Sequence, residues 1–268
     1  RANSASMVMR PPARLVFPGG GIFFWWQAGA ITSLSKRIDL STVPCCGASA
    51  GALAATLAAC DVDMDLALER ALALCEETGA LQRGAWGLYG IWGGVIRQWL
   101  DELLPEDAAQ RCDGRVELLV TTLNPGRLAP SLELPSLRAL AVSDFTGREA
   151  LIDANLASVH VPYFLDGRGT ARFRGGACVD GSLGEMLGGL GLGGRLPQLR
   201  EAYGCRVSHQ DDPRMRARFS GPSDFLRLAS PASVREMMAW GEEHADLMFA
   251  AGGLQVLREE HGAPKGDG

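Results

Sequence analysis

Apolar residues recur along the chain in two patterns, and these patterns predict its helices and strands. Helical spacing, or an alanine-rich apolar run, predicts helices near residues 49–60, 62–78, 95–104, 148–158 and 231–257. Short apolar runs predict strands at 14–17, 115–123, 137–143 and 170–180, with a further strand that contains Cys45 and Cys46. Because strands alternate with helices, we predict one α/β domain with a mainly parallel central sheet and helices on both faces.

The domain is expected to span residues 13–258, between flexible tails at 1–12 and 259–268. Ser, Arg, Ala and Met crowd the first ten positions, and no acidic residue precedes Asp39. A flexible tail explains this composition, and a remnant of an organellar transit sequence is the alternative.

Two glycine-rich stretches interrupt the helical pattern. At 84–94, glycines are interleaved with Trp86, Tyr89 and Trp92. This composition suits a flap that rests on a lipid interface, and it equally suits turns that pack their aromatic rings into the core. The apolar stretch 184–194 is consistent with a loop at an active-site rim or with disorder.

Composition and charge narrow the classes of function. A chain of 268 residues, 47% of them hydrophobic, is long enough to bury a substantial core. The net charge of -5 argues against binding to nucleic acid. No uninterrupted apolar stretch approaches the ~20 residues that cross a bilayer, so we expect any membrane contact to be peripheral.

The seven cysteines form an odd set without metal-binding spacing, which indicates free thiols in a reducing compartment. We therefore expect an intracellular protein, cytoplasmic or organellar with a plastid as one option, and neither a metal nor another cofactor. Cys45, Cys46 and Cys178 lie on predicted strands and are interpreted as small core residues rather than reactive thiols.

A candidate nucleophile lies where an apolar run meets an alanine-rich one. Ser49 is flanked by Gly47 and Gly51, which is the Gly-x-Ser-x-Gly pattern of a nucleophile elbow. Such an elbow needs small neighbours because a strand turns sharply into a helix and presents the serine oxygen. Serine is also favoured as a helix N-cap, and the pentapeptide alone does not separate the two roles.

Upstream, a short strand leads into Gly19, Gly20 and Gly21. Three glycines let a substrate approach backbone N–H groups, as an oxyanion hole requires, and a flexible turn is the alternative. A phosphate cradle fits less well because no Gly-Lys-Ser/Thr follows. Downstream, Asp180 ends a small-residue strand and precedes Gly181, so it is either a base for the serine or part of a turn.

Taken together and in order, these motifs resemble the patatin-like phospholipases, lipid acyl hydrolases that use a Ser–Asp dyad. Gly19-Gly20-Gly21 is similar to the oxyanion-hole glycines of that family, 47–51 to its elbow, and Asp180-Gly181-Ser182 to its Asp-Gly-Gly/Ala motif. The stretch 157–164 is similar to one that the family carries shortly before the aspartate. Two departures are that Phe24 replaces a usual glycine and that Ser182 replaces the commoner Gly or Ala.

The resemblance implies a three-layer patatin-like fold and cleavage of membrane-lipid esters through an acyl-enzyme. Ser49 and Asp180 would be catalytic, and backbone N–H groups of Gly19, Gly20, Gly21 and Ala50 would hold the oxyanion. The expected partner is a lipid at a membrane surface. Phe23, Phe24 and Trp25 are candidates for an acyl-chain pocket, although an aromatic run at a helix start also suits core packing.

The sequence leaves two alternative functions open. An α/β-hydrolase-like esterase, thioesterase or acyltransferase would need a histidine in a triad. The candidates His209 and His244 are both predicted to be solvated, because they lie among polar and acidic residues. The second alternative is a module that binds lipid without turnover.

Overall fold

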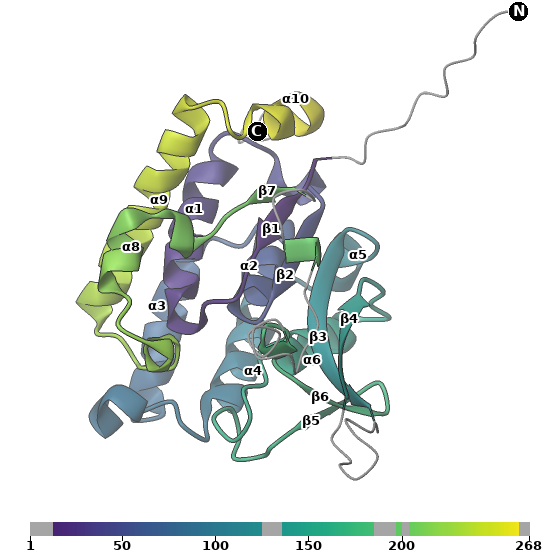
Figure 1. Ribbon diagram of the computed structural model, residues 1–268, viewed down its shortest axis with the longest axis vertical. Helices are drawn as coiled ribbons and strands as arrows, with labels where there is room; N and C mark the ends of the chain where they lie inside the picture. The colour runs from purple at the N-terminus through teal and green to yellow at the C-terminus, as the bar shows by residue number, and fades with distance from the viewer. Residues whose placement is uncertain (1–12, 125–135, 185–196, 200–203, 263–268) are drawn as a thin grey trace, which may run out of the picture.

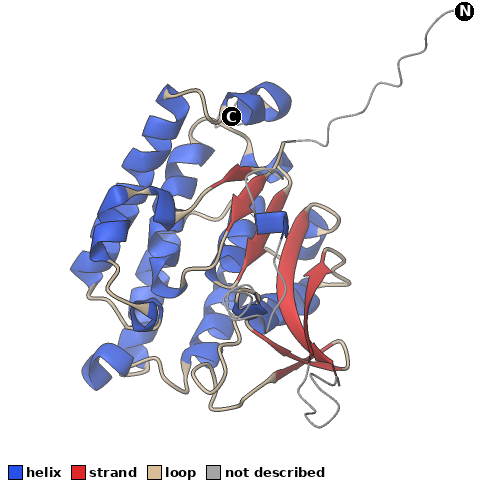
Figure 2. Cartoon of the chain, in the orientation of Figure 1, coloured by secondary structure: helices blue, strands red, loops and turns tan. Residues whose placement is uncertain are grey.

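The fold is built around a mixed β-sheet (Figure 1, Figure 2). The computed structural model describes residues 13–124, 136–184, 197–199 and 204–262. Within these residues the sheet has the order β5-β6-β3-β2-β1-β7, and β4 pairs with β3 outside this path. The strands are β1 (Leu15–Phe17), β2 (Cys45–Ala48), β3 (Val116–Asn124), β4 (Ser136–Val142), β5 (Ala171–Phe173), β6 (Gly176–Val179) and β7 (Cys205–Arg206).

The central strands of the sheet are parallel. β1 pairs in parallel with β2 and β7, and β2 pairs in parallel with β3. β4 and β6 pair antiparallel with β3, and β5 pairs antiparallel with β6. The carboxyl ends of β1 and β2 therefore lie at one edge of the sheet, where both strands lead into glycine-containing turns.

Helices connect and cover these strands. The longer ones are α1 (Phe24–Ser35), α2 (Ala50–Ala59), α3 (Met64–Glu77), α4 (Trp92–Leu103), α6 (Arg148–Ser158) and α9 (Pro231–Ala250). The shorter α-helices are α5 (Ala108–Cys112), α8 (Pro213–Arg218) and α10 (Gln255–His261). Short 3-10 helices are η1 (Gly21–Phe23), η2 (Leu40–Thr42), η3 (Leu81–Trp86), η4 (Pro197–Leu199), η6 (His209–Asp211) and η7 (Pro222–Phe225).

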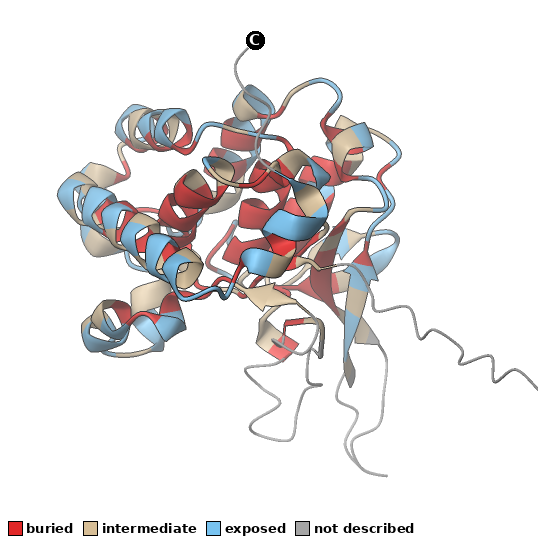
Figure 3. Ribbon diagram, turned by 90° about the horizontal axis from the view of Figure 1, so that it is seen from above, coloured by how far each residue is buried: buried red, intermediate tan, exposed pale blue. Residues whose placement is uncertain are grey.

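The two faces of the sheet pack against different elements. Leu15 and Phe17 point into the main core, on the face covered by α2 and α6. Val16 points to the opposite face, where it clusters with Leu199 of η4. Figure 3 shows the core as a buried interior enclosed by helices whose outer faces are exposed. The prediction of a three-layer α/β fold with a mostly parallel sheet is confirmed.

Helices α1 and α9 lie side by side and approach each other closely (Figure 1). A Cβ atom at Gly29 of α1 would lie 1.8 Å from the carbonyl oxygen of Met238, and one at Gly241 of α9 would lie 1.9 Å from that of Trp26. Glycine is therefore required on both helices. None of the helices in the described ranges is both long and apolar enough to cross a bilayer.

Several element boundaries differ from the sequence predictions. The strand expected at 170–180 is a hairpin of β5 and β6, because Arg174 and Gly175 have positive φ angles of 49° and 81° and turn the chain. The helix expected at 231–257 is divided into α9 and α10 around Gly252, whose φ is 78°. α10 also extends past the expected domain end at 258. The tail predicted at 1–12 and residues 185–194 of the second glycine-rich stretch lie outside the described residues.

Candidate active site

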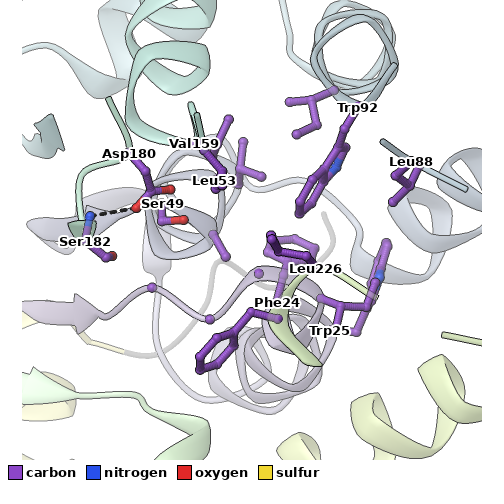
Figure 4. Close-up of a pocket in the computed structure, with 18 of the residues that line it drawn as sticks. Phe24, Trp25, Ser49, Leu53, Leu88, Trp92, Val159, Asp180, Ser182 and Leu226 are labelled. Atoms are coloured by element: carbon purple, nitrogen blue, oxygen red, sulfur yellow. Dashed lines mark hydrogen bonds between the residues drawn. The ribbon is translucent and has the colours of Figure 1, made fainter. Parts of the chain in front are cut away.

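Ser49 lies at a sharp turn between β2 and α2. Its backbone has φ 54° and ψ -129°, a strained conformation for a residue with a side chain. Ser49 occupies the N-cap position of α2, but its side chain makes no capping hydrogen bond. The hydroxyl is therefore not used as a helix cap, and Figure 4 shows it beside Asp180 at the edge of a pocket.

The two glycines of the elbow are required by close backbone contacts. A Cβ atom at Gly47 would lie 2.0 Å from the carbonyl oxygen of Gly51. A Cβ atom at Gly51 would lie 1.9 Å from the carbonyl oxygen of Phe17, at the end of β1. The elbow is thus packed against itself and against the neighbouring strand, which holds Ser49 in its strained conformation.

Asp180 follows β6 and is brought next to Ser49 by the pairing of β6 with β3. Burial raises the pKa of its carboxyl group to about 6, while the side chain of Ser49 and the backbone N–H groups of Ser182 and Leu183 lower it. The N–H of Ser182 donates to Oδ1 at 2.8 Å (Figure 4). Oδ2 is buried, and no atom of the described residues lies in hydrogen-bonding geometry with it. The carboxyl group is therefore close to Ser49 and retains an oxygen for accepting a proton.

Ser158, at the end of α6, links the elbow to the aspartate. Its hydroxyl accepts a hydrogen bond from the N–H of Ser49 at 2.9 Å and donates one to the carbonyl oxygen of Leu119 at 2.7 Å. Its carbonyl oxygen accepts the N–H of Gly181 at 2.7 Å. Sequence reasoning noted the stretch 157–164 as a resemblance but did not assign Ser158 a role. Nothing local marks this serine, because all three contacts are made to distant segments.

The glycine loop after β1 faces the same site. Gly19, Gly20, Gly21 and Ala50 all line the pocket that contains Ser49. Gly21 has φ 53°, and a Cβ atom there would lie 2.0 Å from the carbonyl oxygen of Phe225. As the first residue of α2, Ala50 has an N–H group without an acceptor inside its own helix. The loop therefore exposes backbone to a bound molecule, as an oxyanion hole requires.

The pocket is a largely apolar cavity of about 600 Å³, a volume in the range of small-molecule sites. Phe24 and Trp25 line it and contact Trp99 of α4 edge-on, at ring-centroid distances of 5.6 and 6.2 Å. Leu53, Leu88, Trp92 and Leu226 complete the wall drawn in Figure 4. Phe23 points elsewhere, because its ring packs against His209, Phe219 and Phe225. The cavity thus includes two of the three aromatic residues proposed for an acyl chain.

The aromatic residues of 84–94 are divided between the cavity and the surface. Trp92 lines the cavity, whereas Trp86 and Tyr89 are 49% and 51% exposed. All three rings contact Phe164 edge-on. Neither a detached flap nor a buried turn describes this stretch, and its role at a lipid interface stays a prediction.

The prediction that His209 is solvated is wrong. Its side chain is buried against the glycine loop, and a Cβ atom at Gly20 would lie 2.8 Å from its Cε1 atom. Burial, with the nearby charge of Arg206, lowers the pKa of His209 to about 4, so the ring is neutral near pH 7. His244 is half-buried against Trp26, with ring centroids 5.3 Å apart. The residues next to His209 in the sequence are polar, which is why the sequence predicts a solvated ring. In the 3-10 helix η6, however, only the side chain of His209 turns inward.

The sequence is similar to known proteins that act on lipids. Residues 15–188 match the sequence model of a family described as patatin-like phospholipase. A human omega-hydroxyceramide transacylase is 29% identical over 178 residues, which make up 65% of this chain and 31% of that protein. A mouse 1-acylglycerol-3-phosphate O-acyltransferase is 27% identical over 178 residues, 65% of this chain and 40% of that protein. The chain spans less than half the length of these relatives.

Proposed function

The chain belongs to the patatin-like phospholipase family, and from that premise we propose that it is a serine acyl hydrolase that cleaves carboxylic ester bonds of membrane lipids. The observation that carries the proposal is the position of Ser49. This residue is strained, lies beside a buried carboxyl group, and opens onto a largely apolar cavity. A strained nucleophile with an adjacent base is the arrangement that acyl transfer needs.

In the proposed mechanism, Asp180 accepts the proton of the Ser49 hydroxyl as Oγ attacks the ester carbonyl. Backbone N–H groups of the glycine loop and of Ala50 stabilise the negative charge that develops on the carbonyl oxygen. The tetrahedral intermediate collapses, the proton passes to the departing alcohol, and the acyl group stays on Ser49. Water then attacks the acyl-enzyme, again giving its proton to Asp180, and the fatty acid is released as Ser49 regains its proton.

The cavity wall supports a lipid substrate. Phe24, Trp25 and Leu53 are apolar and lie beyond Ser49, so an acyl chain bound there would place its carbonyl at the nucleophile. The ester end would remain near the polar groups of Ser49 and Asp180. In this proposal the protein meets its substrate at a membrane surface.

The test is covalent labelling of Ser49 by a fluorophosphonate. We expect the wild-type protein to be labelled and to hydrolyse p-nitrophenyl butyrate, and we expect the variant Ser49→Ala to do neither while keeping its melting temperature. The exposed residue Ser143 offers a matched control, since Ser143→Ala should behave as wild type. A folded wild-type protein that resists labelling would favour a module that binds lipid without turnover.

Acyl transfer is the second candidate, because the relatives are named as a transacylase and an acyltransferase. In that reaction an acceptor alcohol replaces water in the attack on the acyl-enzyme, and every other step is unchanged. Labelled phosphatidylcholine vesicles supplied with a long-chain alcohol separate the two reactions. Release of free fatty acid alone supports the hydrolase, whereas a new ester that depends on Ser49 supports the transferase.

A further inference from the structure

Ser182 is a polar residue of the site whose side chain has no role in the proposed mechanism. It stands where the resembling family motif commonly has Gly or Ala. Its backbone N–H is already used, because it donates to Oδ1 of Asp180 at 2.8 Å. Its side chain lines the cavity and points away from the Asp180 carboxyl group, toward the glycine loop (Figure 4).

The Ser182 hydroxyl lies directly against the loop that would form the oxyanion hole. A Cβ atom at Gly19 would lie 2.2 Å from Oγ of Ser182 and 3.1 Å from Cβ of Ser49. Gly19 therefore lies between the two serines, and a side chain at position 19 would displace the Ser182 hydroxyl from its observed place. This places the hydroxyl on the same side of the cavity as the nucleophile and the glycine loop.

The hydroxyl is also unpaired. Oγ of Ser182 is inaccessible to solvent and has no hydrogen-bond partner in the part of the chain that the structure describes. An unpaired buried hydroxyl destabilises a folded protein, and an alanine would avoid that loss. A bound molecule that supplies the missing acceptor would explain why a hydroxyl is present.

We propose that the Ser182 side chain turns about its Cα–Cβ bond when substrate binds and donates a hydrogen bond from its hydroxyl to the substrate carbonyl oxygen as it becomes the oxyanion. Ser182 would so add a side-chain donor to the backbone donors of the glycine loop. This inference rests on the proposed function, because it requires an ester carbonyl at Ser49. Ser182 forms no covalent bond in this role. A donor that acts mainly on the developing charge raises kcat more than it lowers KM.

Two variants of Ser182 separate this role from simple packing. Ser182→Ala keeps the Cβ atom beside Gly19 and removes only the hydroxyl, whereas Ser182→Gly removes both. With p-nitrophenyl butyrate we expect both variants to lose about 10- to 100-fold in kcat, with KM within about twofold of wild type. Binding of a trifluoromethyl ketone, which forms a tetrahedral adduct on Ser49, should weaken by the same factor as kcat/KM. The melting temperature of Ser182→Ala should not fall, because the variant removes an unpaired buried group.

Three results would overturn the proposal. The first is a Ser182→Ala variant with wild-type kcat. The second is a loss of activity that is accompanied by a lower melting temperature and is much greater for Ser182→Gly, because both features indicate packing. The third is a shift in the pH at which the rate is half-maximal, because it would show that the hydroxyl acts on Asp180. Fluorophosphonate labelling of wild-type Ser49 is measured alongside, so that failure of the proposed function is seen separately.

Discussion

The carboxyl group of Asp180 has a pKa raised to about 6, and in the proposed mechanism its ionised form accepts the proton of Ser49. We therefore expect kcat/KM to rise with pH, to reach half its maximum near pH 6 and to be level above pH 7. Stopped-time assays with p-nitrophenyl butyrate between pH 4.5 and 8 measure this profile. Asp180→Asn should lose most activity across the range, whereas Asp166→Asn, at an exposed position, should follow the wild-type profile.

No histidine is expected to take part in the proton transfer. His244→Gln and His261→Gln should keep wild-type turnover of the same ester. His160 and His209 are buried, so their variants are compared only after their melting temperatures are known. A histidine variant that stays folded but loses as much activity as Ser49→Ala would indicate a triad.

Ser158 is expected to act as a positioning residue for the elbow. Ser158→Ala leaves the N–H of Ser49 without its acceptor, which should lower the free energy of unfolding by about 1–3 kcal/mol. Because the elbow then loses a support, kcat should fall while labelling still occurs at Ser49. Urea unfolding and ester hydrolysis measure the two effects. An unchanged kcat would contradict the positioning role.

At the scale of elements, the close contact of α1 and α9 makes a stability prediction. Gly241→Ala places a methyl group against the carbonyl oxygen of Trp26 and should destabilise the protein by about 1–3 kcal/mol. Gly94→Ala is a matched control, because Gly94 is exposed on α4 with no atom within 4 Å of a new Cβ. There the same change should be neutral or should stabilise by up to about 1 kcal/mol. Thermal unfolding of both variants checks the difference.

Trp86 and Tyr89 make a prediction about the lipid surface. If their exposed halves enter the headgroup region, the double variant Trp86→Ser/Tyr89→Ser should bind phosphatidylcholine vesicles about tenfold more weakly. Turnover of a soluble ester should be unchanged, because neither residue lines the cavity. Leu247→Ser is the control for losing an exposed apolar side chain on another element, α9. Equal losses on vesicles and on the soluble ester, with a lower melting temperature, would assign both rings to packing alone.

At the scale of the whole molecule, Asp180 makes stability depend on pH. Its folded-state pKa of about 6 is above its ordinary value of 3.8, so the folded protein binds this proton more tightly. The stabilisation it gives is therefore lost as pH rises from about 4 to above 6, by up to about 3 kcal/mol. His209 acts in the opposite sense, because burial lowers its pKa to about 4 and stability is lost as pH falls below its ordinary range.

The variant Asp180→Asn isolates the contribution of the carboxyl group. Its free energy of unfolding should exceed that of the wild type by an amount that grows between pH 4 and pH 7.5, while the contribution of His209 cancels in the comparison. Urea unfolding of both proteins at several pH values measures this difference. A difference that does not grow with pH would mean that Asp180 is not buried in its ionised form.

Sequence reasoning succeeds in this protein where the determinants are local. Gly47, Ser49 and Gly51 mark the elbow because one tight strand-to-helix turn permits few residue types, and the ordered motifs around Gly19 and Asp180 indicate the family. The α/β class follows in the same way, since the period of apolar residues reflects the geometry of each element. The sequence alone does not show where glycine breaks a helix or turns a strand, as at Gly252 and Gly175, because glycine is also found inside elements.

The tertiary structure decides what depends on packing between distant segments. The burial of His209, the link from Ser158 to the N–H of Ser49, and the direction of the Phe23 ring all arise from contacts with residues far away in the chain. The raised pKa of Asp180 has the same origin, because it reflects the exclusion of water by surrounding elements. The sequence by itself therefore determined the fold class and the pattern of the Gly-x-Ser-x-Gly motif, whereas the environment of each proposed catalytic group was decided only when the strands and helices came together.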